Sequence, residues 1–292
     1  MIVEEQLAYE SRVKMRQAIV AGVAGILLVG AAALQLSGPQ SKVNELTIGL
    51  ITVHKRFPID VIGALLNALG LAAVGWTLSF MFSITKARRP ELKDFIRPIA
   101  IAGAALAGIA AVLYAVLVAV KAHDFVTVGS QTYEQANALT KGAAFVAVPL
   151  FGQLGSLLLA VGFVLIALNA MRVGLLSKFM GYLGVFTGAL VLFPIGSPVP
   201  VVQGFWLLAL AYLLSGRWPT GVPEAWSTGV ATPWPTAQAM RERRMSSSAG
   251  AGRSKPAKPA KPAATPPAET VSAPAASRTR ATTPKRKRKR RS

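Results

Sequence analysis

Six stretches of this 292-residue chain consist mainly of apolar residues and contain no Asp, Glu, Lys, Arg or His. A helix needs about 20 such residues to cross a hydrocarbon core of about 30 Å, so runs of this kind limit the fold more than any other feature. Composition agrees, because 52% of the residues are hydrophobic and only 15% are charged, whereas about a quarter are charged in a typical soluble domain. We expect an all-α integral membrane protein whose transmembrane domain, residues 1–216, is a six-helix bundle with spans at 18–36, 61–82, 98–120, 143–171, 179–195 and 199–214.

Three of these runs admit a second interpretation. Phe179–Ile195 would cover only about 25 Å at 1.5 Å per residue, and only Gly196, Ser197 and Pro198 separate it from the last run. A re-entrant hairpin is therefore the alternative to two full spans. The first run could instead be a signal peptide with Ala31–Ala33 as the cleavage site, although the acidic residues before it and the length of the apolar run favour a retained helix.

The basic residues predict the orientation, because cytoplasmic loops carry the excess of Lys and Arg. With the N-terminus inside, the inner segments hold 27 of these residues and the outer loops hold 5. The sequence thus predicts that both termini lie in the cytoplasm.

The membrane interior offers little chemistry. Absence of ionisable residues from all six runs argues against proton relays and ion-coupled transport. Polar residues at depth include Asn67, Thr77 and Gln153, which predict either hydrogen bonds between helices or, as an alternative function, the lining of a channel or facilitator for a small neutral or weakly polar solute. Pro149 is expected in the first turn of its helix, where proline is tolerated.

No residue pattern indicates an enzyme. The chain has no cysteine and only two histidines, His54 and His123, so the usual zinc sites are not expected. Neither an acid–base pair nor a phosphate-binding or nucleophile motif is present in the sequence. We expect a non-enzymatic protein without a cofactor.

Small residues four apart allow close approach of helices. The pair Gly184 and Gly188 is an example. Its expected role is packing within the bundle, and the alternative is the contact face of a homodimer.

The last apolar run is followed by a segment rich in Trp and Pro, residues 217–245. Tryptophan favours the headgroup level of a bilayer, so Trp218, Trp226 and Trp234 are expected to anchor an extended segment on the inner membrane surface. The motif Arg217-Trp218-Pro219, with Trp226 and Pro233-Trp234-Pro235, resembles that of actinobacterial multi-pass membrane proteins of unknown function. The resemblance covers residues 181–242 and implies a bacterial plasma membrane, but no activity.

Residues 246–292 form a low-complexity basic tail. Its only large apolar residue is Val271, so we expect it to be disordered. The chain ends in seven consecutive basic residues: Lys285, Arg286, Lys287, Arg288, Lys289, Arg290 and Arg291. We expect this tail to dock on anionic lipid, on nucleic acid without sequence preference, or on an acidic protein. A solubilising or topology-fixing tail is the alternative.

Overall fold

The computed structural model describes residues 3–37, 46–192, 200–219, 221–234 and 241. The chain divides into two compact units, 1–236 and 237–292, and every helix discussed below belongs to the first. The described residues are helical and contain no strand. The predicted disordered tail and its seven terminal basic residues lie outside the described residues.

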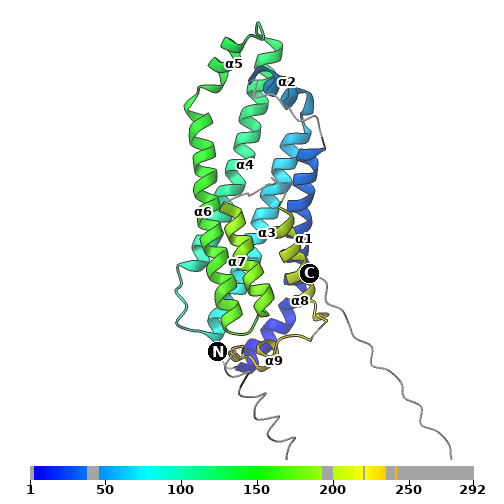
Figure 1. The fold of residues 1–292 in the computed structure, drawn as a ribbon, viewed down its shortest axis with the longest axis vertical. Coiled ribbons are helices and arrows are strands. Elements are labelled where there is room, and N and C mark those ends of the chain that lie inside the picture. The colour runs from blue at the N-terminus through cyan, green and yellow to red at the C-terminus, as the bar shows by residue number, and fades with distance from the viewer. Residues whose placement is uncertain (1–2, 38–45, 193–199, 220, 235–240, 242–292) are drawn as a thin grey trace, which may run out of the picture. The chain divides into compact units, whose positions relative to one another are not determined.

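Four helices are long and apolar enough to cross a membrane, which supports the prediction of a membrane protein. They are α1 (Val3–Leu36), α3 (Ile59–Arg88), α4 (Ile96–Thr127) and α6 (Ala143–Arg172). The shortest of them has 30 residues, about 45 Å at 1.5 Å per residue. Successive long helices pack side by side in the order α1, α3, α4, α6 (Figure 1).

Glycine lets α4 and α6 approach to backbone contact. A Cβ built on Gly155 would lie 2.5 Å from the backbone nitrogen of Ala107, and one on Gly103 would collide with the backbone nitrogen of Leu159. Lipid tails are as apolar as these side chains, so the hydrophobic effect does not drive helices together within a membrane. Close packing of this kind is therefore a main source of helix association.

The helices extend beyond the predicted apolar runs. Helix α1 begins at Val3 rather than near residue 18, because its polar leader continues the same helix without a break. Ala31 and Ala32, at the alternative cleavage site, are buried within α1. Pro149 lies in the second turn of α6 rather than the first, since α6 begins at Ala143.

Two short helices occupy loops for which no structure was predicted. They are α2 (Leu46–Arg56) and α5 (Tyr133–Thr140), and both pack on α4 at one end of the bundle. Leu50, Ala122, Phe125 and Ala136 form a small core among them. We call this end the α2–α5 end, and the opposite end, where α9 (Ala225–Thr228) lies, the α9 end (Figure 1).

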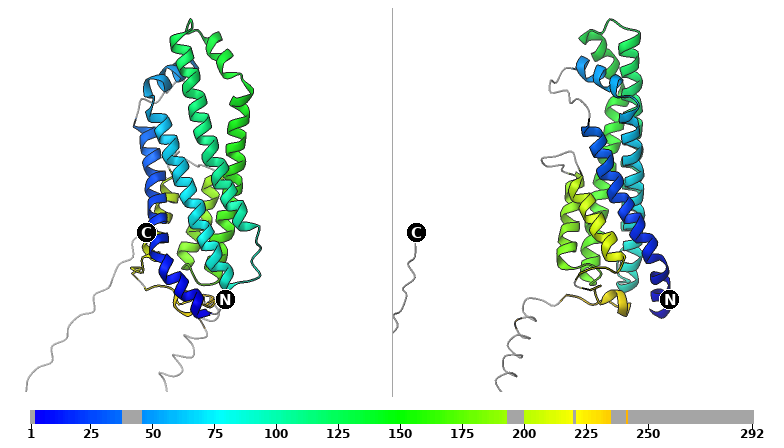
Figure 2. Two further views of the ribbon diagram at one scale, coloured as in Figure 1. Left: turned by 180° about the vertical axis from the view of Figure 1, so that it is seen from behind. Right: turned by 90° about the vertical axis from the view of Figure 1, so that its right-hand side faces the viewer.

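The last two apolar runs form short helices, so the prediction of six complete spans is not confirmed. Helix α7 (Lys178–Leu192) has 15 residues and α8 (Val201–Leu214) has 14, about 22 and 21 Å respectively. Helix α7 packs on α6 and α8 packs on α1, and the pair covers only the half of the bundle toward the α9 end (Figure 2).

Shared pocket lining and a close backbone approach locate the far ends of this pair midway along the long helices. Leu192, the last residue of α7, lines a pocket together with Gln153 and Ser156 of α6. Gly204, near the start of α8, lies beside Gly25 of α1, where a Cβ on Gly25 would be 3.0 Å from the Gly204 carbonyl. Both contacts fall near the centres of the apolar runs of α6 and α1.

Candidate functional site

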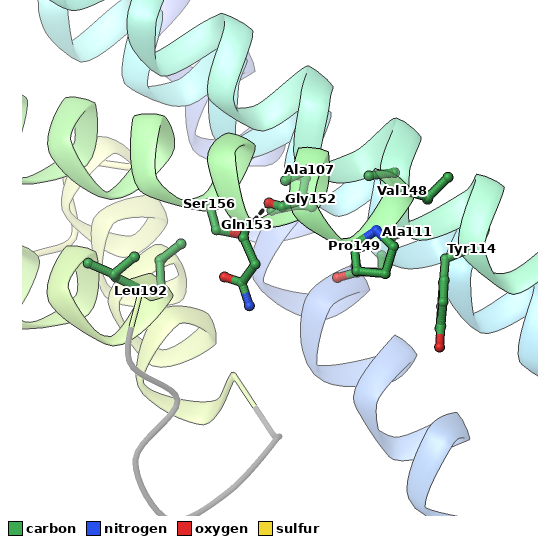
Figure 3. Close-up of a pocket in the computed structure, with 13 residues that line it drawn as sticks. Ala107, Ala111, Tyr114, Val148, Pro149, Gly152, Gln153, Ser156 and Leu192 are labelled. Carbon is green, nitrogen blue, oxygen red and sulfur yellow. Dashed lines mark hydrogen bonds between the residues drawn. The ribbon is translucent and has the colours of Figure 1, made fainter. Parts of the chain in front are cut away.

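A pocket of about 510 Å³ opens beside Leu192, the last residue of α7. Helices α3, α4, α6 and α7 line it (Figure 3). Most of the lining is apolar or small, and the polar side chains are those of Asn67, Tyr114, Gln153 and Ser156. A largely apolar cavity with a few convergent polar groups is the usual form of a small-molecule site.

The two amides of this pocket lie at similar depth. Asn67 is the ninth residue of α3 and Gln153 the eleventh of α6, about 12 and 15 Å from the first residues of those helices. Both helices begin at the α2–α5 end (Figure 1), so both amides lie in the half of their helix that is nearer to that end. The sequence-predicted pair is thus brought to one cavity.

The amides of Asn67 and Gln153 have no hydrogen-bond partner among the described residues, although the Ser156 hydroxyl donates to the Gly152 carbonyl at 3.0 Å. Pro149, which also lines the pocket, has no N–H to offer the Phe145 carbonyl. A polar group without a partner is costly at membrane depth, so this cavity favours water or a polar ligand over lipid tails.

Thr77, the third predicted pore residue, lies elsewhere. Its side chain is fully buried in α3 and its hydroxyl donates to the Ala73 carbonyl at 2.8 Å. Asn169 is also distant from Asn67, because it accepts a hydrogen bond from Arg89 and donates one to the Leu165 carbonyl.

A second polar assembly lies at the α9 end. Arg88, the last residue of α3, is paired with Glu10 of α1 through two bonds of 2.7 and 2.8 Å, and it also donates to the carbonyl of Ala225 at 2.7 and 2.9 Å. Gln6 donates to the Glu10 carboxylate at 2.9 Å. We call Gln6, Glu10, Arg88 and Ala225 the Arg88 cluster; it ties two long helices to the chain that follows α8.

The tryptophans of the Trp/Pro segment make protein contacts. The indole N–H of Trp226 donates to the Leu175 carbonyl at 2.9 Å, and that of Trp234 donates to the Leu176 carbonyl at 2.8 Å. Trp226 is buried beneath the Nζ of Lys14, which lies 4.6 Å from the ring centre. Trp218 packs partly buried against the main core.

These contacts differ from the expected extended segment on a membrane surface. Within residues 221–234 the chain turns, forms α9, and closes over the link between α6 and α7, where Thr232 donates to the Val173 carbonyl at 3.1 Å. Gly174 has a φ of +81° in that link, and a Cβ there would collide with the Thr232 carbonyl. Contact of Trp218 or Trp234 with lipid headgroups stays a prediction.

Gly184 and Gly188 face neighbouring helices of the same chain. A Cβ on Gly184 would lie 2.8 Å from the Cβ of Ala167, and one on Gly188 would lie 2.8 Å from Cγ2 of Val164. Since α6 covers this face, the two glycines offer no exposed stripe to a second copy.

The described residues contain no group of three or more His, Asp, Glu or Cys side chains able to hold a metal ion. Comparison of the chain with family models, with curated proteins and with solved structures found no match. The functional argument therefore depends on the residues themselves.

Proposed function

We propose that the protein is a multi-pass anchor in the bacterial plasma membrane that presents its basic C-terminal tail to anionic lipid on the cytoplasmic side. Nucleic acid and an acidic protein are the other partners that such a tail would suit. Residues 217–292 hold 17 Lys and Arg against three Glu, and seven of the basic residues are consecutive at the end. Each basic residue near an anionic leaflet contributes about 1 kcal/mol.

The topology in this proposal has four crossings and a hairpin. Helices α1, α3, α4 and α6 cross, while α7 and α8 enter and leave at the α9 end without crossing. Two observations support it: the lengths of 15 and 14 residues, and the position of Leu192 and Gly204 beside the middle of α6 and α1. Four crossings leave both termini on the same side, as six would, and the excess of basic residues supports the cytoplasm as that side.

The observation that carries the proposal is the attachment of the chain just before the tail. Arg88 holds Ala225, Trp226 is bonded to Leu175, and Trp234 to Leu176. The docked chain therefore reaches Trp234, and 11 residues separate this fixed point from the start of the tail at residue 246. Tethering of this kind gives the tail a high effective concentration at the adjacent leaflet, which favours lipid over a soluble partner.

The test uses the full chain in nanodiscs of neutral phosphatidylcholine, mixed with anionic or neutral vesicles. We expect co-flotation with anionic vesicles only, decreasing as salt rises, and lost when residues 285–291 are all replaced by Gln. The matched control replaces the four basic residues Arg253, Lys255, Lys258 and Lys261 by Gln. This control should reduce co-flotation with anionic vesicles less than the 285–291 variant does. Equal flotation of the 285–291 variant would contradict the proposal, and competition by duplex DNA at low concentration would favour nucleic acid.

The pocket supports a second candidate, a facilitator or receptor for a small neutral solute. Its support is the joint presence of the unpaired Asn67 and Gln153 amides in one cavity between the long helices. In proteoliposomes, urea and glycerol are suitable probes, and Asn67→Leu and Gln153→Leu should each reduce flux. Thr77→Val is the matched control, because Thr77 is buried outside the pocket. Flux that is absent, or unchanged in both Leu variants, would rule out this candidate.

A further inference from the structure

The only two histidines of the chain, His54 and His123, meet at the α2–α5 end although 69 residues separate them. His54 lies in the last turn of α2 and His123 near the end of α4. Their ring centres are 5.6 Å apart and their planes are inclined by 35°. Both side chains are at least partly accessible. The sequence alone gives no sign of this pairing, because the residues lie in separate predicted loops.

This separation suits a shared metal ion. Imidazole nitrogens bind Zn²⁺ at about 2.0–2.1 Å, so two imidazoles on one ion have ring centres roughly 5–6 Å apart. No described group is hydrogen-bonded to either ring, which leaves the ring nitrogens available. Imidazole is a suitable ligand for Zn²⁺, Cu²⁺ and Ni²⁺, and affinity within this series is highest for Cu²⁺.

The surroundings provide space and nearly balanced charge. A pocket of about 300 Å³ adjoins both rings, and its other walls are apolar, with Phe57 and Val120 among them. Lys121 is paired with Asp124 at 3.3 Å, and Arg56 with Asp60 at 2.8 Å, so neither cation is left without a counter-charge beside the site. Water can therefore complete the coordination shell on the open side.

We propose that His54 and His123 form a binding site for a divalent first-row transition metal, which joins α2 to α4. The site goes beyond the proposed function, since neither the tail nor the Asn67–Gln153 pocket takes part in it. With two protein ligands it binds less tightly than a closed four-ligand zinc site, and its remaining positions hold water or a group from a ligand. Bound metal fixes α2 to the long helix beneath it.

The test titrates Cu²⁺ and, separately, Zn²⁺ into the full chain in detergent, purified with a tag that contains no histidine. Because the chain has no cysteine and only two histidines, no thiolate and no third imidazole of the chain can bind the ion. We expect one Cu²⁺ per chain, nitrogen hyperfine structure from two imidazoles in the electron paramagnetic resonance spectrum, and slower amide hydrogen exchange in α2.

Single variants decide between a shared site and separate weak ones. His54→Gln and His123→Gln should each lower the affinity at least tenfold and remove the two-nitrogen signal, while the helix content by circular dichroism stays unchanged. Either variant should also remove the metal-dependent protection of α2, because the ion reaches α4 only through both rings. Failure to bind, or loss in one variant but not in the other, would overturn the proposal, because a shared ion needs both rings.

Discussion

Arg88 and Glu10 lie 78 residues apart in the chain and form a two-bond ion pair in which the Arg88 side chain is fully buried and that of Glu10 is 4% exposed. The guanidinium also donates hydrogen bonds to the carbonyls of Ile84 and Ala225. A buried pair is itself weak evidence for stability, but removing one partner leaves a buried charge without compensation. The pair therefore supports the docking of residues 221–234, because it fixes the guanidinium that bonds to Ala225.

The first prediction concerns this pair. Glu10→Gln should destabilise the α9 end by about 3–5 kcal/mol, because Arg88 keeps its charge in a buried position. Trp226 should then become accessible, and chymotrypsin should cleave the Trp226–Ser227 bond. Trp218 and Trp234 are each followed by proline, so they do not compete as cleavage sites. Glu4→Gln, at an exposed position of the same helix, should leave the bond protected; equal protection in both variants would contradict the role of the pair.

The second prediction concerns the Trp226 indole. Trp226→Phe retains most of the ring but removes the N–H that bonds to the Leu175 carbonyl, so the stability should fall by about 1–3 kcal/mol. Thermal unfolding in detergent measures the change. Trp76→Phe is the control, because Trp76 is 63% exposed. A loss as large at Trp76 as at Trp226 would show that the hydrogen bond is not the cause.

The third prediction concerns the contact between α4 and α6. Gly103→Ala should destabilise the bundle by about 1–3 kcal/mol or more, because the new methyl group meets backbone of α6 that cannot move aside. Gly30→Ala in α1 is the matched control, since a Cβ there has nothing within 4 Å and alanine favours the helix. The melting temperatures of the two variants should therefore move in opposite directions, and a stable Gly103→Ala protein would show that α4 and α6 are farther apart than described.

The four long helices could be predicted from the sequence, because a charge-free apolar run of 19 residues or more is typical of a membrane-spanning helix. It was not sufficient for α7 and α8, because an apolar run of about 16 residues suits a half-crossing as well as a short span. Helices α2 and α5 were not predicted because every charged stretch between apolar runs was treated as a loop. Each of them buries only a narrow apolar face, with Leu50 in α2 and Ala136 in α5, beside polar neighbours.

The polar contacts could not be predicted for a different reason. Glu10 with Arg88 and His54 with His123 are pairs between helices that are not consecutive in the chain or that meet through an unpredicted helix. Hydropathy gives the depth of a residue but not the direction in which its side chain points. For the Trp/Pro segment, the prediction used the preference of tryptophan for lipid headgroups. An indole N–H can also donate to a carbonyl left free just after a helix, and Trp226 does so to the carbonyl of Leu175.

The last prediction tests the hairpin through single cysteines in this cysteine-free chain. If α7 and α8 cross only half of the bilayer, a cysteine in place of Ser197 should not react in intact cells with a thiol reagent that cannot permeate membranes. Val128→Cys, in the exposed turn after α4, is the positive control and should react from outside. Arg290→Cys should react only after the cells are opened, because the proposed topology places the tail inside. Rapid external labelling at residue 197 would restore two complete spans, and external labelling at residue 290 would reverse the orientation of the whole chain.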